Sequence, residues 1–547
     1  MKSFSVFLVF ILAAFSAVAQ TDTNAIVVPV ETNAPAPPSA TNAAAVSAGM
    51  SALDPVGRPV GLYGTNAAAV PAGMNAAPRA MSLEDCIQEA LRHNLDVQIE
   101  RYSPQISLYN LRGAYSGYDP LLNVSGQHSY NKSGVDGIPP MISDENSFKS
   151  DLGGSLPWGL QYDFSGNISE QSGLYPSGSS SSTNFDNSSG SVGVQLTQPL
   201  LKNFWIDNTR LTIRVAKNRL KYSEQVLRLQ VITSVTDVEN AYYELIYAQE
   251  NVKVQREALD LAQTQFDQDK QRVQIGTLAQ LDVQQDEAQV ATSKANLIAA
   301  QSTLNTAQNT LKNLLTDEYL RWHDQDIQPT ATITNAPLQL FDLQDSWSKG
   351  MTMRPDLLQA RLDVEKQGIQ LKFDRNQLFP ELDLIGTYGY NGAAREYSGT
   401  FNQFNEGDRP FYSYGAQLSV PLSNVKARNT VNYDKVTMQQ LVLTLKQFEQ
   451  NTMVEIDNAV KQAQSAYESV SATRQARIYA EAALDAEQKK YAVGKSTTFI
   501  VLQLQNTLTA DRAQEIRSLA NYYEALAKLA QQEGSTLERN HINIEVK

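Results

Sequence analysis

Two regions of the chain, residues 119–200 and 380–421, alternate apolar and polar positions in the manner of β-strands. Leu122 and Val124 would share one face of an extended strand, with Asn123 and Ser125 on the other. The candidate strands run from Leu122 to Tyr130, Phe148 to Leu156, Leu160 to Ile168, Val192 to Leu196, Leu382 to Tyr390 and Tyr412 to Val420. One polar face and one apolar, Tyr-rich face are typical both of a transmembrane barrel wall and of a soluble antiparallel sheet. The alternation alone leaves both structures open.

The first segment after these strands has helical periodicity over an unusual length. No Gly or Pro occurs in the 71 residues from Trp205 to Ile275, which as one helix would be about 105 Å long. Apolar residues recur every seven positions, at Val231, Val238, Leu245, Val252, Leu259, Phe266 and Val273. A seam of this length predicts a coiled coil. Because it far exceeds the helices of ordinary globular domains, it also favours the barrel wall over the soluble sheet.

Gly276 and Gly494 each follow a long helical segment, and each predicts a hairpin tip, since glycine adopts the left-handed conformation that ends helices. The returning helices are about 30 residues shorter than their partners. Medium helices predicted at 82–115 and 343–378 would make up that difference if stacked end to end with them. This match predicts the wall of a long tube. Two hairpins cannot close such a tube, so we expect an oligomer.

Most of the chain reads as one unit present twice. Asn240-Ala241 and Gly276 match Asn458-Ala459 and Gly494 at an offset of 218. We therefore expect a first repeat at 81–330 and a second at 338–535, each with a helix, a β region and a helical hairpin. The hairpins are predicted at 205–320 and 425–533, and a C-terminal tail at 536–547. The first repeat holds about 38 additional residues, between Pro120 and Pro199.

The N-terminus has the pattern of an export signal. Lys2 precedes an apolar run from Phe4 to Phe15, and Ala17-Val18-Ala19 is a small-residue cleavage site, so residues 1–19 are predicted to be a signal peptide. The alternative, a membrane anchor, needs a run of about 20 apolar residues. Residues 20–80 hold eight of the 21 prolines among many Ala, Asn and Thr, which predicts a disordered linker.

Composition excludes several classes of function. The 45 basic and 58 acidic residues give a net charge of −13, which argues against a nucleic-acid-binding protein. One cysteine and four dispersed histidines exclude a disulfide framework and a Cys-rich metal site, and Cys86 is expected in core packing. No metalloprotease, phosphate-loop or nucleophile-elbow motif occurs. We therefore expect no enzyme activity, no cofactor and no metal.

The ordered set of motifs from residue 81 to 535 resembles the TolC family of outer-membrane efflux proteins, also called outer membrane factors. The resemblance lies in Arg354-Pro355-Asp356-Leu357, Pro120 to Gly126, Pro380 to Gly386, Gln198-Pro199-Leu200, Val420-Pro421-Leu422, Val273 to Gly276 and Tyr491 to Gly494. It implies an α+β membrane protein with two internal repeats per chain, assembled as a homotrimer. An antiparallel β-barrel in the outer membrane, usually with four strands per chain, would continue into a periplasmic α-helical coiled-coil barrel.

The sequence departs from this family pattern in two places. Six candidate strands exceed the usual four, so residues 148–170 form either an extra hairpin of the wall, which we favour, or an extracellular extension. Ile500 and Gln503 stand where some relatives carry an acidic constriction ring, which argues against a cation-selective ring. The resemblance also implies a periplasmic gate in which Asp282 contacts Tyr491. Alternatively, Asp282 is a solvated acid at a helix start.

The resemblance implies further sites and partners. The tips, Gly276-Thr277-Leu278 and Gly494-Lys495-Ser496, would dock a periplasmic adaptor protein, and Pro199 and Pro421 would mark the junctions from strand to helix. The protein would then be the passive exit duct of a tripartite efflux or type I secretion system, taking cargo from an inner-membrane pump through the outer membrane of a Gram-negative bacterium. The alternative is a periplasmic coiled-coil scaffold with a soluble β-domain. The cargo is not encoded in a recognisable site.

Overall fold

The computed structural model describes residues 78–543, apart from 135, 137, 178–180, 334 and 338–340. The chain divides into two units, residues 1–75 and residues 76–547, and the description below concerns the second unit. The predicted signal peptide and most of the predicted linker lie outside the described residues. The last residues assigned to the linker differ from expectation, because Arg79–Met81 form β1, which pairs in parallel with β6 (Ile327–Pro329).

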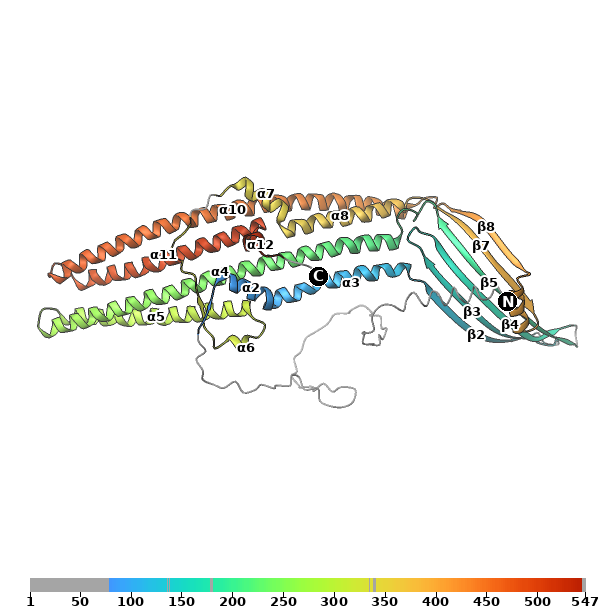
Figure 1. Ribbon diagram of the computed structural model, residues 1–547, viewed down its shortest axis with the longest axis horizontal. Coiled ribbons are helices and arrows are strands. Elements are labelled where there is room, and N and C mark those ends of the chain that lie inside the picture. Colours follow the sequence, from blue (N-terminus) through green and yellow to red (C-terminus); the bar gives the residue numbers. More distant parts are fainter. Residues whose placement is uncertain are drawn as a thin grey trace, which may run out of the picture. The chain divides into compact units, whose positions relative to one another are not determined.

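Six antiparallel strands form one sheet in the order β2-β3-β4-β5-β7-β8 (Figure 1). They are β2 (Leu121–Ser133), β3 (Met141–Ser155), β4 (Gln161–Pro176), β5 (Ser182–Pro199), β7 (Glu381–Ala394) and β8 (Pro410–Ser419). The strands are longer than the alternation indicated, and β5 has 18 residues. Residues 148–170 belong to the hairpin of β3 and β4, which lies within the sheet between β2 and β5.

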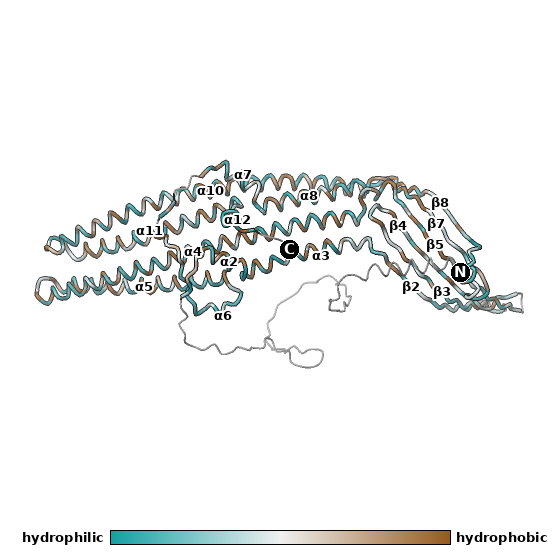
Figure 2. The backbone as a smooth tube through the Cα atoms, in the orientation of Figure 1, coloured by the Kyte–Doolittle hydropathy of each residue, from teal (hydrophilic) through white to brown (hydrophobic). Residues whose placement is uncertain are grey.

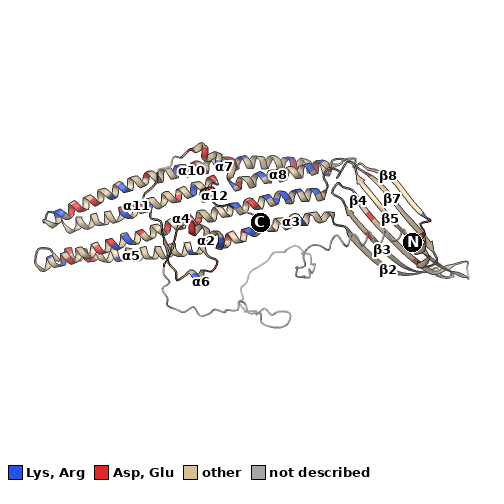
Figure 3. Cartoon of the chain, in the orientation of Figure 1, with Lys and Arg blue, Asp and Glu red and all other residues tan. Residues whose placement is uncertain are grey.

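Large apolar side chains of the sheet are left uncovered by the described chain. Val124 in β2 is 73% exposed, and Tyr414 and Leu418 in β8 are 88% and 61% exposed. Charged residues are spread along the long helices, whereas the strands carry few of them (Figure 3). Exposed apolar side chains in such number are typical of a surface that contacts lipid or another protein chain.

Four helices form two antiparallel hairpins. In the first, α4 (Asn208–Gln274) has 67 residues and α5 (Gln280–Leu315) has 36. In the second, α10 (Val425–Ala492) has 68 residues and α11 (Thr498–Glu533) has 36. Asp207 caps α4 by accepting the backbone N–H of Arg210 at 2.7 Å. Hydrophobic and hydrophilic positions are interspersed along all four helices (Figure 2), as expected for helices that each bury only a narrow stripe.

The predicted seam of α4 is buried at four of its seven positions. Val231, Val238, Leu245 and Val252 are buried, whereas the three positions nearest the tip are partly exposed. Burial is therefore deepest in the middle of the unit, where α4, α5 and α2 (Leu83–His93) share one core. The seam grows more open toward the tip, which leaves that end less tightly packed.

The two medium helices are each broken in two, where one continuous helix was predicted. The first consists of α2 and α3 (Leu95–Ala114) and breaks at Asn94, whose side chain accepts the Val97 N–H at 3.1 Å and caps α3. Asparagine favours this capping position over a helix interior. The second consists of α7 (Leu343–Met353) and α8 (Pro355–Asn376). It breaks because the residue before a proline is driven to extended backbone and Pro355 supplies no N–H.

Several short elements were not predicted. A helix, α9 (Tyr397–Glu406), lies between β7 and β8 and ends at Gly407 with φ of 71°. The single-turn elements are η1 (Tyr115–Tyr118), α6 (Tyr319–Trp322) and α12 (Thr536–Arg539). The last lies in the segment assigned to the C-terminal tail, where Arg539 and Asn540 bond the buried carboxylate of Glu239 at 2.7 and 2.9 Å. The start of this tail is thus held against α4.

None of the described helices contains a stretch both long and apolar enough to cross a membrane.

Candidate periplasmic gate and hairpin tips

Both hairpins end in the same helix-capping turn. Gly276 has φ of 76°, its N–H bonds the Val273 carbonyl at 3.0 Å, and the next N–H, of Thr277, bonds the Arg272 carbonyl at 2.9 Å. At the second tip Gly494 has φ of 72°, and the equivalent bonds to Tyr491 and Lys490 measure 3.0 and 2.9 Å. Glycine is favoured here because a Cβ strains the left-handed conformation.

The tip residues predicted to dock a partner lie at the surface. Gly276, Thr277, Gly494 and Lys495 are exposed, and Leu278 and Ser496 are partly exposed. The second tip is braced internally, since the Ser496 hydroxyl donates to Glu487 at 2.6 Å. Lys490 also contacts Glu487, at 2.8 Å. These two bonds hold the pKa of the Glu487 carboxyl below its ordinary value, Lys490 having the larger effect.

Tyr491 joins the two hairpins close to the tips, but through a different acid from the one predicted. Its hydroxyl donates to Oδ2 of Asp269 on α4 at 2.7 Å and lies 2.9 Å from the Thr498 hydroxyl. Asp282 lies in the first turn of α5 and is partly exposed. Asp269 is fully buried on α4, two turns before the tip, and this inward position makes it the acceptor.

Asp269 is the centre of a small buried network. Gln265 donates to its Oδ2 at 2.5 Å, and Nη1 of Arg272 lies 3.2 Å from its Oδ1. The Arg272 guanidinium also lies over the Tyr491 ring, 4.7 Å from the ring centroid. Tyr491 of α10 therefore contacts both the Asp269 carboxylate and the Arg272 guanidinium of α4. A second buried carboxyl group, Asp286 of α5, faces Asp269.

Ile500 and Gln503, the residues predicted at the constriction, are both exposed on α11. Ile500 is 39% exposed. The structure does not bring them into the described network around Asp269 and Tyr491. Neither carries a charge, so the surface that they form has no anionic field of its own.

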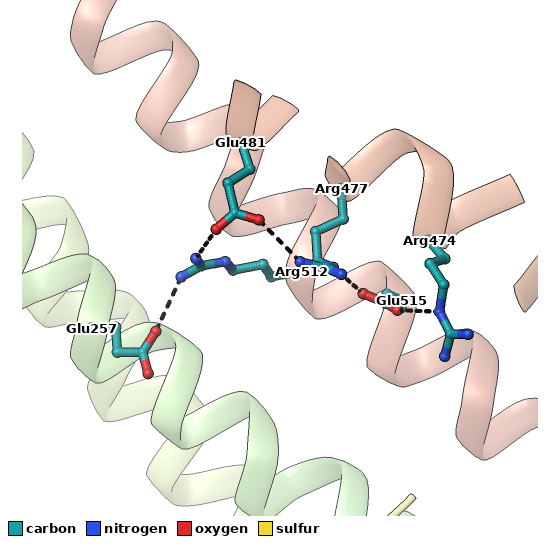
Figure 4. Close-up of polar contacts among 6 residues, drawn as sticks. All are labelled: Glu257, Arg474, Arg477, Glu481, Arg512 and Glu515. Atoms are coloured by element: carbon teal, nitrogen blue, oxygen red, sulfur yellow. Dashed lines mark hydrogen bonds and ion pairs between the residues drawn. The ribbon is translucent and has the colours of Figure 1, made fainter. Parts of the chain in front are cut away.

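A second link between the hairpins lies farther from the tips and was missed by the sequence analysis. Arg512 of α11 reaches Glu257 of α4 at 3.0 Å and Glu481 of α10 at 3.2 Å (Figure 4). Glu481 also contacts Arg477 at 3.1 Å, and Arg477 contacts Glu515 at 2.5 Å. Arg474 lies 3.0 Å from Glu515. The chain of alternating charges thus crosses from one hairpin to the other through Arg512.

Further polar pairs connect the hairpins along their length. Gln289 of α5 and Asn506 of α11 exchange amide hydrogen bonds of 2.7 and 3.1 Å. Closer to the middle of the unit, Arg517 of α11 pairs with Glu244 of α4. Long polar side chains on separate helices give no periodic signal in the sequence. Only their positions in space identify these contacts.

Cys86 lies in the core, as expected from the sequence. Cys86 is completely buried, and this burial, with the nearby Asp85, raises the pKa of its thiol to about 12. Within the part of the chain that the structure describes, no cluster of three or more His, Cys, Asp or Glu side chains could hold a metal ion.

Pro199 and Pro421 lie between the sheet and the long helices. Pro199 is the last residue of β5, and α4 follows at Asn208. Pro421 lies two residues after the end of β8, and α10 begins at Val425. Proline has no N–H to donate to a strand ladder and is therefore tolerated at strand ends such as these. Both residues therefore lie at the predicted junctions.

A family model described as outer membrane efflux protein matches residues 86–316 and 351–535, which together span most of the chain. The chain belongs to the outer membrane efflux protein family. The outer membrane protein TolC of Escherichia coli K12 is 25% identical over 390 residues, covering 69% of this chain and 73% of that protein. The cation efflux system protein CusC of the same strain is 23% identical over 295 residues, covering 53% and 61%.

Solved structures of the family share the fold. The crystal structure of the outer membrane protein VceC of Vibrio cholerae aligns with a TM-score of 0.60 and 17% identity, over 83% of this chain and 96% of that one. The resemblance inferred from the ordered sequence motifs is thereby confirmed. The sheet and helical hairpins described above are the fold that this chain shares with VceC.

Proposed function

We propose that this protein is the outer-membrane exit duct of a tripartite efflux or type I secretion system. The observation that carries the proposal is the combination, in one chain, of a six-stranded sheet with exposed apolar side chains and two helical hairpins longer than a bilayer is thick. The sheet would lie in the outer membrane and the hairpins in the periplasm. Export by a cleaved signal peptide of residues 1–19 is part of this proposal.

The sheet supports a closed barrel made by several chains. Its edge strands, β2 and β8, have no partner on their outer side within the described residues, and β2 is exposed along its whole length. Unpaired edges in a membrane are too costly to persist, so β8 of one chain would pair with β2 of the next. A homotrimer would then close about 18 strands, within the range of known outer-membrane barrels.

The helices support a tube of matching symmetry. In each half of the chain a medium helix precedes strands and a long hairpin follows them, and we propose that these halves are internal repeats. Apolar side chains on the outer surface of α3, such as Ile99, Tyr102 and Ile106, are exposed in the single chain. Contact with a neighbouring chain would bury them, so the proposed trimer accounts for both the sheet and the helices.

The tips support a gate and a docking site. We propose that Tyr491, bonded to Asp269, holds the periplasmic end closed, with Asp282, Ile500 and Gln503 nearby on the same end. The exposed residues of the two capping turns, Gly276 to Leu278 and Gly494 to Ser496, would contact a periplasmic adaptor protein that joins the duct to an inner-membrane pump. Cargo is then selected by the pump, and the duct conducts passively.

Cell fractionation tests this proposal against a soluble periplasmic scaffold. A duct should be recovered with the outer membrane and should migrate as a detergent-resistant oligomer. Cysteine pairs placed in β2 and β8 should cross-link between chains, whereas pairs placed in the neighbouring strands β4 and β5 should cross-link only within one chain. Recovery of a monomer in the soluble periplasmic fraction would contradict the proposal.

A further inference from the structure

Two carboxyl groups face each other inside the first hairpin, just behind its tip. Asp269 of α4 is completely buried and Asp286 of α5 is 1% exposed. Asp269 is well supplied with donors, namely Gln265, Arg272 and Tyr491. Among the described residues, no donor reaches either side-chain oxygen of Asp286. A buried carboxylate without a donor is costly, so this side chain needs an explanation.

A proton on Asp286 supplies the missing donor. Two ionised carboxylates held together out of water repel strongly, whereas one proton turns that repulsion into a hydrogen bond. Burial raises the pKa of Asp286 to about 7, and the charge of Asp269 and a hydrogen bond to it add to the effect. The missing donor and the raised pKa of Asp286 therefore both favour a proton on this side chain.

The groups around the pair explain why the proton resides on Asp286. On α4, Arg272 forms an ion pair with Asp269, with Nη1 3.2 Å from Oδ1. On α5 itself, the charge of Asp282 raises the pKa of Asp286 further. From α10, Tyr491 donates to Asp269, and from α11 the uncharged hydroxyl of Thr498 lies 2.9 Å from the Tyr491 hydroxyl. Among the described residues, the donors of this network therefore serve Asp269.

We propose that Asp269 and Asp286 form a proton-binding site that regulates the contact between the two hairpins. With the proton bound, Asp286 donates to Asp269 and keeps it in place for Tyr491. When the proton leaves, the two carboxylates push α4 and α5 apart directly beneath that contact. The consequence for gating rests on the proposed function, whereas the titration of the pair does not depend on it.

The sign of the pH effect follows from the raised pKa. The closed packing of the tip favours the protonated form of Asp286. The stabilisation of the closed tip by this proton is therefore complete below the ordinary pKa of 3.8, falls as the pH rises, and is lost above about 7. If an opened tip restores the ordinary pKa, the opening equilibrium should increase by at most about tenfold between pH 6 and pH 8.5. The tips should therefore open more readily in alkaline solution.

Amide hydrogen exchange of the purified full-length oligomer tests the inference, with rates corrected for the intrinsic effect of pH. Peptides covering 262–290 should show up to about tenfold more opening at pH 8.5 than at pH 6. Asp286→Asn, whose amide can donate to Asp269, should remove this difference and keep the low-pH exchange. Glu287→Gln is the matched control, because Glu287 is the adjacent, exposed carboxylate, and it should behave as the wild type.

A second variant keeps the test decisive if Asp286→Asn does not fold. Asp269→Asn removes the charge that faces Asp286. The increase in opening between pH 6 and pH 8.5 should therefore become smaller, and the pH at which opening increases should move toward acid. Equal opening at both pH values in the wild type, or an unchanged difference in both variants, would overturn the inference. If the opening of the tips depends on pH as expected but the protein never conducts ions, the proton-binding site is supported and the proposed exit duct is contradicted.

Discussion

Removing the Tyr491 hydroxyl is the sharpest perturbation of the proposed gate. Tyr491→Phe deletes the bonds to Asp269 and Thr498 but keeps the ring beneath Arg272. A hydrogen bond to a charged acceptor contributes about 1.5–3 kcal/mol. Asp269 keeps its bonds to Gln265 and Arg272, so the loss should fall at the lower end, about 1.5 kcal/mol per chain. That is about a tenfold shift of the equilibrium toward the open state.

Single-channel recording in planar bilayers measures this shift. The variant should show a higher conductance or a larger open fraction than the wild type at the same voltage and salt. Tyr479→Phe serves as the control, because Tyr479 lies on the same helix and is 69% exposed. Wild-type conductance in Tyr491→Phe, or an equal rise in the control, would refute the gate assignment.

Three other changes test separate parts of the structure. Arg512→Ala should remove the bridge between Glu257 of α4 and Glu481 of α10. Exposed ion pairs contribute up to about 1 kcal/mol each, so the open fraction in planar-bilayer recording should rise about two- to fivefold. Arg512→Lys, which keeps the charge, should show a smaller rise. Gly276→Ala should destabilise the tip by about 1–2 kcal/mol through its positive φ alone, because no atom lies within 4 Å of the added Cβ, and local hydrogen exchange would report it. Cys86 should resist thiol reagents at pH 8 until the protein is denatured, and labelling of the native protein would contradict its burial.

The sequence was sufficient to predict the elements because their signals are local and periodic. The heptad seam through Val238 and Leu245 predicts one long helix, and α4 is that helix. Gly276 predicts the end of α4 and Gly494 the end of α10, and both adopt the positive φ that only glycine accepts readily. The alternation around Phe148 and Phe164 predicts strands, and these residues lie in β3 and β4.

The sequence was insufficient where a residue's partner is far away in the chain. Tyr491 and Asp269 are separated by 222 positions, and nothing in the local pattern distinguishes Asp269 from Asp282 as the acceptor. The burial of Asp269 decides which aspartate accepts the hydrogen bond, and this burial is known only once α4, α5 and α10 are packed together. The helix breaks at Asn94 and Arg354 could have been predicted from the sequence. Asparagine is a common N-cap residue, and the proline that follows Arg354 is common at the first position of a helix.

Planar-bilayer recording of the purified oligomer tests the central claim most directly. The account predicts that the wild-type protein inserts as a discrete channel and conducts ions, and that Tyr491→Phe conducts more. A purified, folded oligomer that never conducts, even with both Tyr491 and Arg512 substituted to open the tips, would contradict the conclusion that this chain forms an exit duct.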